Sequence, residues 1–423
     1  MRNVVVTGLG FATSIGNNAS AVLDSLQNLK HGIAPFVDAI DPSNPVHVAG
    51  NIQDFNTTGY DPEDWTYPEE YNIRREVLRG LSPHGLYALC ATQQAIADAS
   101  LTEDLLSNPS TGLYTASAGS AGCLSHHMER MNERGVLRCY PLAIVASIAG
   151  TLTFNLVAAL KILGSSCGFV SACASSGHAL GYAFDEIATG RQDRIIVVGA
   201  EDGNRESIIP FAGMRALTSS KDPNTASRPF DKNRDGFVCT GGATTLILED
   251  ESSAQARGAR IYARFNGWGQ ASDGYNVAIS HPEGDGLARA INLALKATGI
   301  NAQDIDYVNA HATSTSIGDT SEMRALKSVF LNNGGASPAI SSTKALTGHG
   351  LSLASAMEAA FCTLSIHHGI MPGSAHIETL DPEAEGLNII QETRPEAPKT
   401  VLSNSSGFGG ANVALIFSKY SNP

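Results

Sequence analysis

Strand-like and helical apolar patterns alternate along almost the whole 423-residue chain. Strand-like runs include NVVVTG, RIIVVG, TTLILED, DIDYVNAH and VALIF, and helical patterns include SPHGLYALCATQQAIADA, GLARAINLALKATG and ASAMEAAFCTLSIHHG. Continuous apolar strands are typical of sheets buried on both faces, and the intervening helices cover those faces. The sequence therefore predicts an α/β fold with largely buried sheets. The point at which the chain is most readily divided into two parts lies near Ser252–Gly258.

The charge balance argues against several classes of partner. The formal net charge is -13, which disfavours nucleic acid and anionic membrane surfaces as main partners. No apolar run approaches the ~20 residues that a membrane-spanning helix needs, and no signal peptide is recognised before the first strand. TGLGFATSIG follows that strand, but Gly8, Gly10 and Gly16 do not form the G-x-G-x-x-G dinucleotide fingerprint.

The cysteines are odd in number and scattered: Cys90, Cys123, Cys139, Cys167, Cys173, Cys239 and Cys362. They form no C-x-x-C pair and no Cys/His cluster with zinc spacing. This pattern predicts a reduced, cytoplasmic protein without a structural metal.

One cysteine stands at a position suited to chemistry, in GFVSACASSGHALGYAFDEIATG. Val170 is expected to end a buried strand, and the apolar residues from Leu180 to Ile187 have helical spacing that stops at Gly190. Cys173 then lies at a strand-to-helix turn, where unpaired N–H groups and the helix dipole favour a thiolate. The alternative interpretation is a small buried side chain, because free cysteines are often buried.

Three further segments carry reactive residue types after strands or in turns. His311 lies in YVNAHATSTSIGDTSE, Lys344 and His349 lie in SSTKALTGHGLSLASAMEAA, and Phe408 lies in SNSSGFGGANVALIF. Each residue has an ordinary structural interpretation when taken alone. Together they fit acyl transfer, in which a thiolate attacks a carbonyl and imidazoles move a proton or stabilise negative charge. Backbone N–H groups of the glycine-rich turn can form an oxyanion hole.

The segments VSACASS, NAHATST, SSTKALTGH and NSSGFGGAN, in this order, resemble the signature segments of the elongating β-ketoacyl-acyl carrier protein synthases, specifically the KAS II-like members. The resemblance covers essentially the whole chain. It implies a thiolase-like layered αβαβα fold made of two similar halves, over residues 1–255 and 256–423. It also implies a homodimer, with acyl carrier protein as the partner that delivers the substrates.

The resemblance further implies a role for each matching residue. Cys173 would accept the acyl chain, and His311 and His349 would assist decarboxylation of malonyl-acyl carrier protein. Lys344, paired with Glu358, would tune the site, and the N–H groups of Cys173 and Phe408 would form the oxyanion hole. The expected substrate contacts are Thr313 and Thr315 for the phosphopantetheine arm, Phe408 with Gly409 for a gate, and Ala118 and Phe211 for the acyl pocket. No metal or redox cofactor is implied.

Several positions depart from the family pattern. They are Ala312, Ser406, Ala411, Ser352, Ser355 and Gly241, the last of which stands in a run that lacks the usual acidic residue. The pocket position that often holds Ile is matched by Ala118. None of these changes removes a reacting group. Because they cluster around the site, we expect a synthase specialised for unusual chains, either long or unsaturated.

Arginine clusters suggest how an acidic carrier protein docks on an acidic enzyme. Arg74, Arg75 and Arg79 form one cluster, and Arg130, Arg134 and Arg138 repeat every four residues, which places them on one face if the segment is helical. The first cluster, with Arg138 and Arg215, matches docking positions of the family. The alternative interpretation is an ordinary solvated surface.

Three other functions stay open at the level of sequence. The chain could be a ketosynthase subunit of a type II polyketide or polyene pathway, forming a heterodimer with a related chain-length partner. A degradative thiolase that uses coenzyme A is disfavoured by the pair His311 and His349. A catalytically inactive partner subunit is disfavoured because Cys173, His311, Lys344 and His349 are all present.

Overall fold

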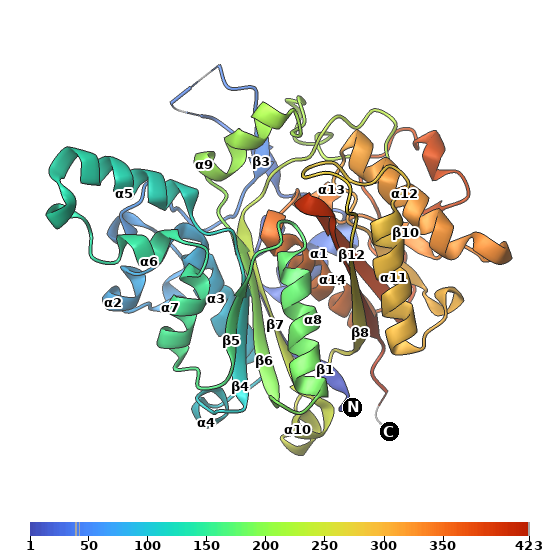
Figure 1. Ribbon diagram of the computed structural model, residues 1–423, viewed down its shortest axis with the longest axis horizontal. Coiled ribbons are helices and arrows are strands. Elements are labelled where there is room, and N and C mark those ends of the chain that lie inside the picture. The colour runs from blue at the N-terminus through green and yellow to red at the C-terminus, as the bar shows by residue number, and fades with distance from the viewer. Residues whose placement is uncertain (39, 42, 422–423) are drawn as a thin grey trace.

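The computed structural model describes residues 1–38, 40–41 and 43–421 (Figure 1). Within these residues, eleven strands form one sheet. In spatial order they are β11 (Asn388–Ile389), β10 (Ala339–Ser341), β9 (Tyr307–Asn309), β12 (Thr400–Gly407), β13 (Ala411–Ser418), β8 (Ala263–Ser272), β1 (Val4–Ala12), β7 (Gly242–Asp250), β6 (Arg194–Glu201), β4 (Thr111–Ala116) and β5 (Ser166–Phe169). A separate ribbon pairs β2 (Ile33–Pro35) with β3 (Val48–Gly50).

The two ends of the sheet repeat one topology. From β1 outward, the strands β7, β6, β4 and β5 pair antiparallel, antiparallel, parallel and parallel. From β8 outward, β13, β12, β9 and β10 pair in the same sequence of directions. β1 pairs antiparallel with β8 and joins the halves. The chain is therefore built from two similar halves, one before and one after α10 (Glu251–Ala256).

Helices occupy equivalent places in both halves. In the first half α3 (Pro83–Asp98) follows β1 and α8 (Ser175–Ala188) follows β5, and in the second half α11 (Asp285–Thr298) follows β8 and α14 (Ala354–His368) follows β10. The other α-helices are α1 (Ala19–Asn28), α2 (Arg75–Leu78), α4 (Glu103–Leu106), α5 (Ala121–Arg134), α6 (Ala143–Ser147), α7 (Thr151–Leu160), α9 (Arg205–Ile208), α12 (Ser316–Phe330) and α13 (Lys344–Thr347).

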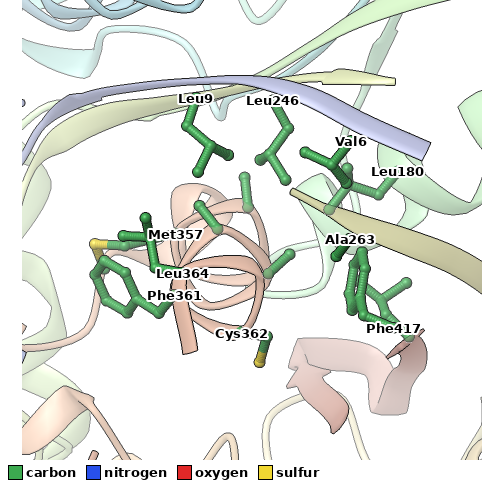
Figure 2. Packing of buried hydrophobic residues seen from close by; sticks show 14 of the residues in the cluster. Val6, Leu9, Leu180, Leu246, Ala263, Met357, Phe361, Cys362, Leu364 and Phe417 are labelled. Atoms are coloured by element: carbon green, nitrogen blue, oxygen red, sulfur yellow. The ribbon is translucent and has the colours of Figure 1, made fainter. Parts of the chain in front are cut away.

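The central helices α8 and α14 lie between the two halves of the sheet. Both belong to one buried apolar cluster that also contains side chains of β1, β7, β8 and β13. Figure 2 shows this packing, with Met357, Phe361 and Leu364 of α14 beneath Leu9 and Leu246. With α3 outside the first half and α11 outside the second, the predicted layered αβαβα arrangement is confirmed.

The early glycines are explained by helix packing. A Cβ on Gly10 would lie 1.9 Å from the carbonyl oxygen of Ala91, and one on Gly8 would lie 2.5 Å from that of Ala95. Both carbonyls belong to α3, so β1 packs directly on this helix only because it carries glycines. The TGLG segment therefore lies within β1, not after the strand, and its glycines serve close strand-to-helix packing.

Two sequence expectations were wrong. Val170 does not end a buried strand, because β5 is the edge strand of the sheet and the Val170 side chain is 63% exposed. Arg138 does not continue the helical face of Arg130 and Arg134, because α5 ends at Arg134 and Gly135 follows with φ +83°. Among the described residues, none of the helices combines the length and apolar composition needed to cross a membrane.

Candidate active site

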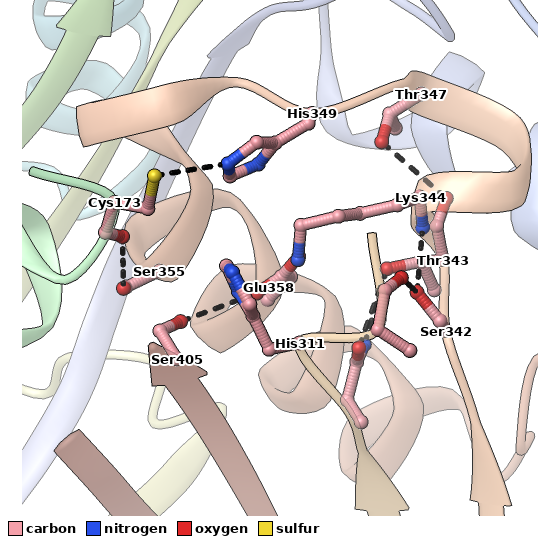
Figure 3. Close-up of polar contacts among 12 residues, drawn as sticks. Cys173, His311, Ser342, Thr343, Lys344, Thr347, His349, Ser355, Glu358 and Ser405 are labelled. Carbon is pink, nitrogen blue, oxygen red and sulfur yellow. Dashed lines mark hydrogen bonds and ion pairs between the residues drawn. The ribbon is translucent and has the colours of Figure 1, made fainter. Parts of the chain in front are cut away.

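The turn between β5 and α8 presents Cys173. Ala172 has φ +51°, a left-handed conformation that is uncommon for a residue with a side chain. Ser175 at the start of α8 stabilises the turn, since its hydroxyl accepts the N–H of Ser171 and donates to the carbonyl of Ala172. Cys173 therefore precedes the helix by two residues, as the sequence predicted, and points toward the second half of the chain (Figure 3).

His349 contacts the candidate nucleophile, Cys173. Its Nε2 lies 3.0 Å from the Sγ of Cys173 (Figure 3). The residue follows the short helix α13 and Gly348, whose φ of +76° turns the chain toward the site. The N–H of His349 donates to the carbonyl of Val238, which fixes the backbone. At this distance a neutral imidazole can accept the thiol proton, or can donate to the thiolate if its hydrogen is on Nε2.

His311 enters the same site from β9. Its ring centroid lies 5.1 Å from that of His349, and the rings are nearly perpendicular. The Glu322 carboxylate on α12 accepts the N–H groups of His311 and Ala312 at 2.8 and 2.6 Å. Asn404 donates to the same carboxylate. Glu322 and Asn404 thus position His311, and sequence reasoning missed both although they stand inside the segments that attracted attention.

Lys344 and Glu358 form an ion pair close to the two histidines. Their side chains are 1% and 0% exposed, and Glu358 is also reached by the hydroxyl of Ser405 (Figure 3). Burial raises the pKa of Glu358 to about 7, against the lowering effect of Lys344. The expected pairing of these residues is therefore present.

Burial and charge set the protonation of Cys173 and the two histidines. Burial, assisted by the charge of Lys344, holds the pKa values of His311 and His349 well below the ordinary value, so both imidazoles are neutral. Burial also raises the pKa of Cys173 to about 12, although Lys344 acts in the opposite direction. In the free protein the site therefore holds a thiol and two neutral histidines, and the lysine is the nearby charge that favours the thiolate.

The glycine-rich turn closes over Cys173. A Cβ on Gly407 would lie 2.7 Å from the carbonyl oxygen of Ser171 and 3.1 Å from the N of Cys173, so glycine allows this contact. The backbone of Phe408 thereby follows directly beside the N–H of Cys173. Gly409 has φ +77° and donates its N–H to the carbonyl of Val277 at 2.7 Å.

A pocket of about 370 Å³ opens onto these groups. Residues predicted from the sequence that line it are Cys173, His311, His349, Thr313, Thr315, Phe211, Phe408, Arg215 and Ser406. The hydroxyls of Thr313 and Thr315 lie 3.1 Å apart on its wall. The ring centroid of Phe211 lies 6.2 Å from that of Phe408 and 5.5 Å from that of Phe237. The Phe237 ring in turn contacts the His349 ring. Sequence reasoning missed Phe237.

Some predicted residues lie apart from this pocket. Ala118 is exposed on the turn after β4, Glu358 is buried behind Lys344, and Gly409 lies in the turn without lining the pocket. Within the described residues, no group of three or more metal-ligating side chains lies together.

Several residues that depart from the family pattern make hydrogen bonds or close packing contacts. Ser352 donates to Glu201, and Ser355 donates to the carbonyl of Cys173 at 3.4 Å. Ser406 donates to Asn412 at 2.6 Å. A Cβ on Gly241 would lie 2.3 Å from the N of Gly203, so the neighbouring backbone leaves no room for the acidic side chain usual in the family.

The arginine clusters adjoin each other on the surface. Arg75 and Arg79 both bind the Glu63 carboxylate, at 2.6 and 2.5 Å, and Arg74 pairs with Glu76. The Tyr140 hydroxyl donates to the carbonyl of Arg79 and so ties this cluster to the segment that carries Arg138. Arg134, Arg138 and Arg215 are exposed.

Comparison with known proteins gives concordant matches. The chain is 40% identical to 3-oxoacyl-[acyl-carrier-protein] synthase 1 of Haemophilus influenzae, over 99% of this chain and 100% of that protein. It is 35% identical to synthase 2 of Synechocystis, over 99% and 98%.

Solved structures agree with these relatives. A β-ketoacyl synthase from Burkholderia phymatum superposes with a TM-score of 0.90 at 30% identity over 100% of both chains. A type II polyketide ketosynthase, solved in complex with its acyl-carrier protein, superposes with a TM-score of 0.89 at 25% identity over 99% and 100%. The family descriptions "Beta-ketoacyl synthase, N-terminal domain" and "Beta-ketoacyl synthase, C-terminal domain" match residues 1–254 and 262–378. The chain belongs to the β-ketoacyl synthase family.

Proposed function

We propose that the protein catalyses the decarboxylative Claisen condensation of an acyl chain with malonyl-acyl carrier protein, as a step of fatty acid chain elongation. The observation that carries the proposal is the contact of Cys173 Sγ with His349 Nε2 at 3.0 Å, beside His311 and at the end of a pocket. The relatives that bear the name 3-oxoacyl-[acyl-carrier-protein] synthase over their full length support the substrate class.

In the first step the sulfur of Cys173 attacks the carbonyl carbon of an acyl thioester on the carrier protein. The carbon–sulfur bond to the phosphopantetheine arm breaks, and the thiol proton passes to the released arm, with His349 next to the sulfur. Backbone N–H groups of Cys173 and Phe408 stabilise the oxyanion. The hydroxyls of Thr313 and Thr315 hold the arm within the pocket.

In the second step malonyl-acyl carrier protein loses carbon dioxide. The electron pair of the broken carbon–carbon bond becomes an enolate, whose oxygen accepts hydrogen bonds from His311 and His349. Neutral imidazoles suit this task, because they donate to a growing negative charge without first needing a proton. The carbanion attacks the acyl carbon on Cys173, the carbon–sulfur bond breaks, and the released thiolate takes up a proton from solvent.

This chemistry needs no metal or redox cofactor, and we propose that none takes part. Loss of carbon dioxide generates the carbanion, so no strong base is required. The seven free cysteines support a reduced, cytoplasmic location.

Docking of the acidic carrier protein is proposed at the joined arginine clusters. Arg138 and Arg134 are exposed, and Arg215 lies at the mouth of the pocket. Arg75 and Arg79 are partly neutralised by Glu63, so the carrier protein must compete with this carboxylate for them.

We also propose that the protein forms a dimer through β5. This strand ends the sheet with unpaired backbone groups, which is an unfavourable exposed edge. The apolar side chains of Phe154 and Val170 lie beside it around a shallow hollow. A second copy related by a twofold axis would cover both and would bring the exposed Ala118 toward the interior. Light scattering on Val170→Lys tests this, with a monomer expected and an unchanged dimer contradicting it.

The acyl preference is proposed to be long or unsaturated chains. Small side chains at Ala118 and Ser406 support this, since both stand where the family often carries bulk. A type II polyketide or polyene ketosynthase is the second candidate, favoured by the type II polyketide ketosynthase at 25% identity and by an ishigamide ketosynthase/chain length factor at 30% identity. The higher identity to fatty acid synthases supports the first.

One assay separates these functions. Purified protein receives malonyl-acyl carrier protein and a panel of acyl-acyl carrier proteins, and the products are identified by mass. Products two carbons longer from fatty acyl chains support elongation, and the best substrates reveal the preference. Condensation only after addition of a related partner subunit would favour the polyketide role. Elongation of only medium saturated chains would overturn the proposed preference.

A further inference from the structure

The segment SRPFDKNRDGFV, over residues 227–238, precedes β7, and the proposed mechanism gives it no role. It lies against the loop that joins β9 to α12, which carries Thr313 and Thr315 on the pocket wall. Backbone N–H groups of the segment and the side chain of its Arg234 donate hydrogen bonds to that loop. The segment is therefore placed to hold the two threonines.

The residue between the threonines has an unfavourable backbone conformation. Ser314 is fully buried and has φ +74°, in the left-handed region that is uncommon for a residue with a side chain. Its N–H donates to the Asp319 carboxylate at 3.1 Å, its hydroxyl accepts the N–H of Arg228 at 3.0 Å, and its carbonyl accepts the N–H of Gly236 at 3.1 Å. Such a conformation persists only where the surroundings fix it, and it is common in segments that hold ligands.

Arg234 holds the end of the same loop. Its side chain is 2% exposed. The Nε donates to the carbonyl of Thr315 at 3.2 Å, and the Nη2 donates to the carbonyl of Ser316 at 3.0 Å and to the hydroxyl of Thr320 at 2.9 Å. A planar guanidinium presents its donors in a fixed fork, so these two consecutive carbonyls are held in one orientation.

Acidic residues fix the guanidinium itself. Asp381 binds Nη1, the carbonyl of Asp231 accepts from Nη1 at 2.8 Å, and Asp319 lies 3.4 Å from Nε. Because Asp319 also accepts the N–H of Ser314, one carboxylate joins both anchors of the loop. Arg234 does not line the pocket, so its effect on a substrate must pass through the loop that it holds.

The anchored loop presents two hydroxyls side by side. The Oγ1 atoms of Thr313 and Thr315 lie 3.1 Å apart. A Cβ on Gly318 would lie 2.5 Å from the Thr315 Oγ1, so the glycine leaves this hydroxyl uncovered. A hydroxyl both donates to a carbonyl and accepts from an N–H, which suits the two amide groups of a phosphopantetheine arm.

We propose that Arg234 is a positioning residue for this arm: by holding the carbonyls of Thr315 and Ser316 it fixes the two threonine hydroxyls where the arm needs them. The inference rests on the proposed function, because it takes this pocket wall to be the arm site. Loss of the fork should weaken binding of the arm and leave the Cys173 sulfur in place. The contacts of Arg234 lie in this loop, in α12 and in the segments of its acidic partners.

The test is an NMR titration with pantetheine, which is the arm without its phosphate, under reducing conditions. Arg234→Lys keeps a positive charge near Asp319 and Asp381 but loses the fork, and it should weaken binding about fivefold, the scale of one hydrogen bond. Arg257→Lys is the matched control, since Arg257 pairs with the buried Glu249 in the first half. This variant should bind pantetheine like the native protein.

A double variant separates positioning from a general loss of structure. Thr315→Val removes one hydroxyl and should weaken pantetheine binding by a similar factor. If Arg234 acts through the threonines, Arg234→Lys should have little further effect in the Thr315→Val background. Alkylation of Cys173 by iodoacetamide, which needs no arm, should keep its native rate in every variant, whereas a disturbed fold would change it.

Three results would overturn the proposal: native affinity in Arg234→Lys, factors that simply multiply in the double variant, or a native protein that binds no pantetheine. If Arg234→Lys does not fold, Thr320→Val decides, because it removes one acceptor of the Nη2 and loosens the fork. Weaker binding supports the proposal, and native affinity overturns it.

The proposed function has its own readout, the transfer of an acyl group from acyl-pantetheine to Cys173, followed by intact mass. A native protein that binds pantetheine and accepts no acyl group would count against the condensation reaction and not against the arm site.

Discussion

Removal of the Lys344 charge by the substitution Lys344→Met is expected to destabilise the protein in a pH-dependent way. The lysine and Glu358 are 1% and 0% exposed and bind each other. Breaking a buried ion pair by removing one partner costs about 3–5 kcal/mol, because the remaining charge is left uncompensated. We expect a loss of this size at pH 8.

The stability that Lys344→Met loses relative to the native protein should be much smaller at pH 6. Glu358 already has a pKa of about 7, raised by burial and lowered by Lys344, so the pKa rises further without the lysine. When the pKa of a carboxyl is higher in the folded than in the unfolded state, the folded protein loses stability as the pH rises from the unfolded-state pKa to the folded-state pKa. At pH 6 the Glu358 carboxyl of the variant is protonated and needs no counter-charge. At pH 8 the folded variant must either bury an unpaired carboxylate or keep a proton that the unfolded chain releases, and both lower its free energy of unfolding.

The assay is urea unfolding of the native protein, Lys344→Met and the double variant Lys344→Met/Glu358→Gln at both pH values. The double variant carries no buried charge at this position and should recover most of the stability lost at pH 8. An unfolding midpoint for Lys344→Met equal to that of the native protein at pH 8 would refute the reasoning. So would a double variant no more stable than the single one.

Three further predictions follow from the site and its surface. Because His311 and His349 stay neutral, decarboxylation of malonyl-acyl carrier protein should show no loss attributable to histidine titration between pH 6 and 8; an inflection near pH 6.5 that disappears in a histidine variant would contradict this. Gly407→Ala places a Cβ 3.1 Å from the N of Cys173 and should slow acylation by about a hundredfold or more, the effect of losing one oxyanion donor. An acylation rate equal to that of the native protein would show that the turn does not form the oxyanion hole. Glu63→Gln removes the carboxylate that pairs with Arg75 and Arg79 and should tighten binding of the carrier protein severalfold at low salt, with less effect at high salt. An unchanged affinity in a titration would show that these two arginines do not belong to the docking surface.

The candidate site residues were predictable because each stands at the end of an element with a local signal. Cys173 precedes a helical pattern, His311 follows an apolar strand, and Lys344 and His349 lie five residues apart before a helix. These positions depend on short-range patterns, and the structure brings them together as expected.

Contacts between distant segments could not be predicted in this way. Glu201 and Ser352 are 151 residues apart, and nothing in either segment indicates that they meet. The exposure of Val170 depends on which strand ends the sheet, and an apolar run looks the same at the edge as at the centre. The duplicated topology of the two halves also leaves no repeat that the eye can find in the sequence, because many apolar sequences satisfy the same strand pairing.

The helical face assigned to Arg138 failed for a reason that was present in the sequence. Gly135 follows Arg134 directly, and glycine with φ +83° ends α5 at that point. The spacing of four alone was therefore insufficient, since a helix stop signal lies between two of the three arginines.

The central claim is that Cys173 carries the acyl chain during condensation. Its most direct test is the intact mass of the protein after incubation with acyl-acyl carrier protein, followed by addition of malonyl-acyl carrier protein. The native protein should gain one acyl group on Cys173 and lose it when the second substrate is added, as a 3-oxoacyl product two carbons longer appears. Cys173→Ala should gain none. A folded native protein that takes up no acyl group from any chain, or a Cys173→Ala variant that is acylated equally well, would contradict the claim.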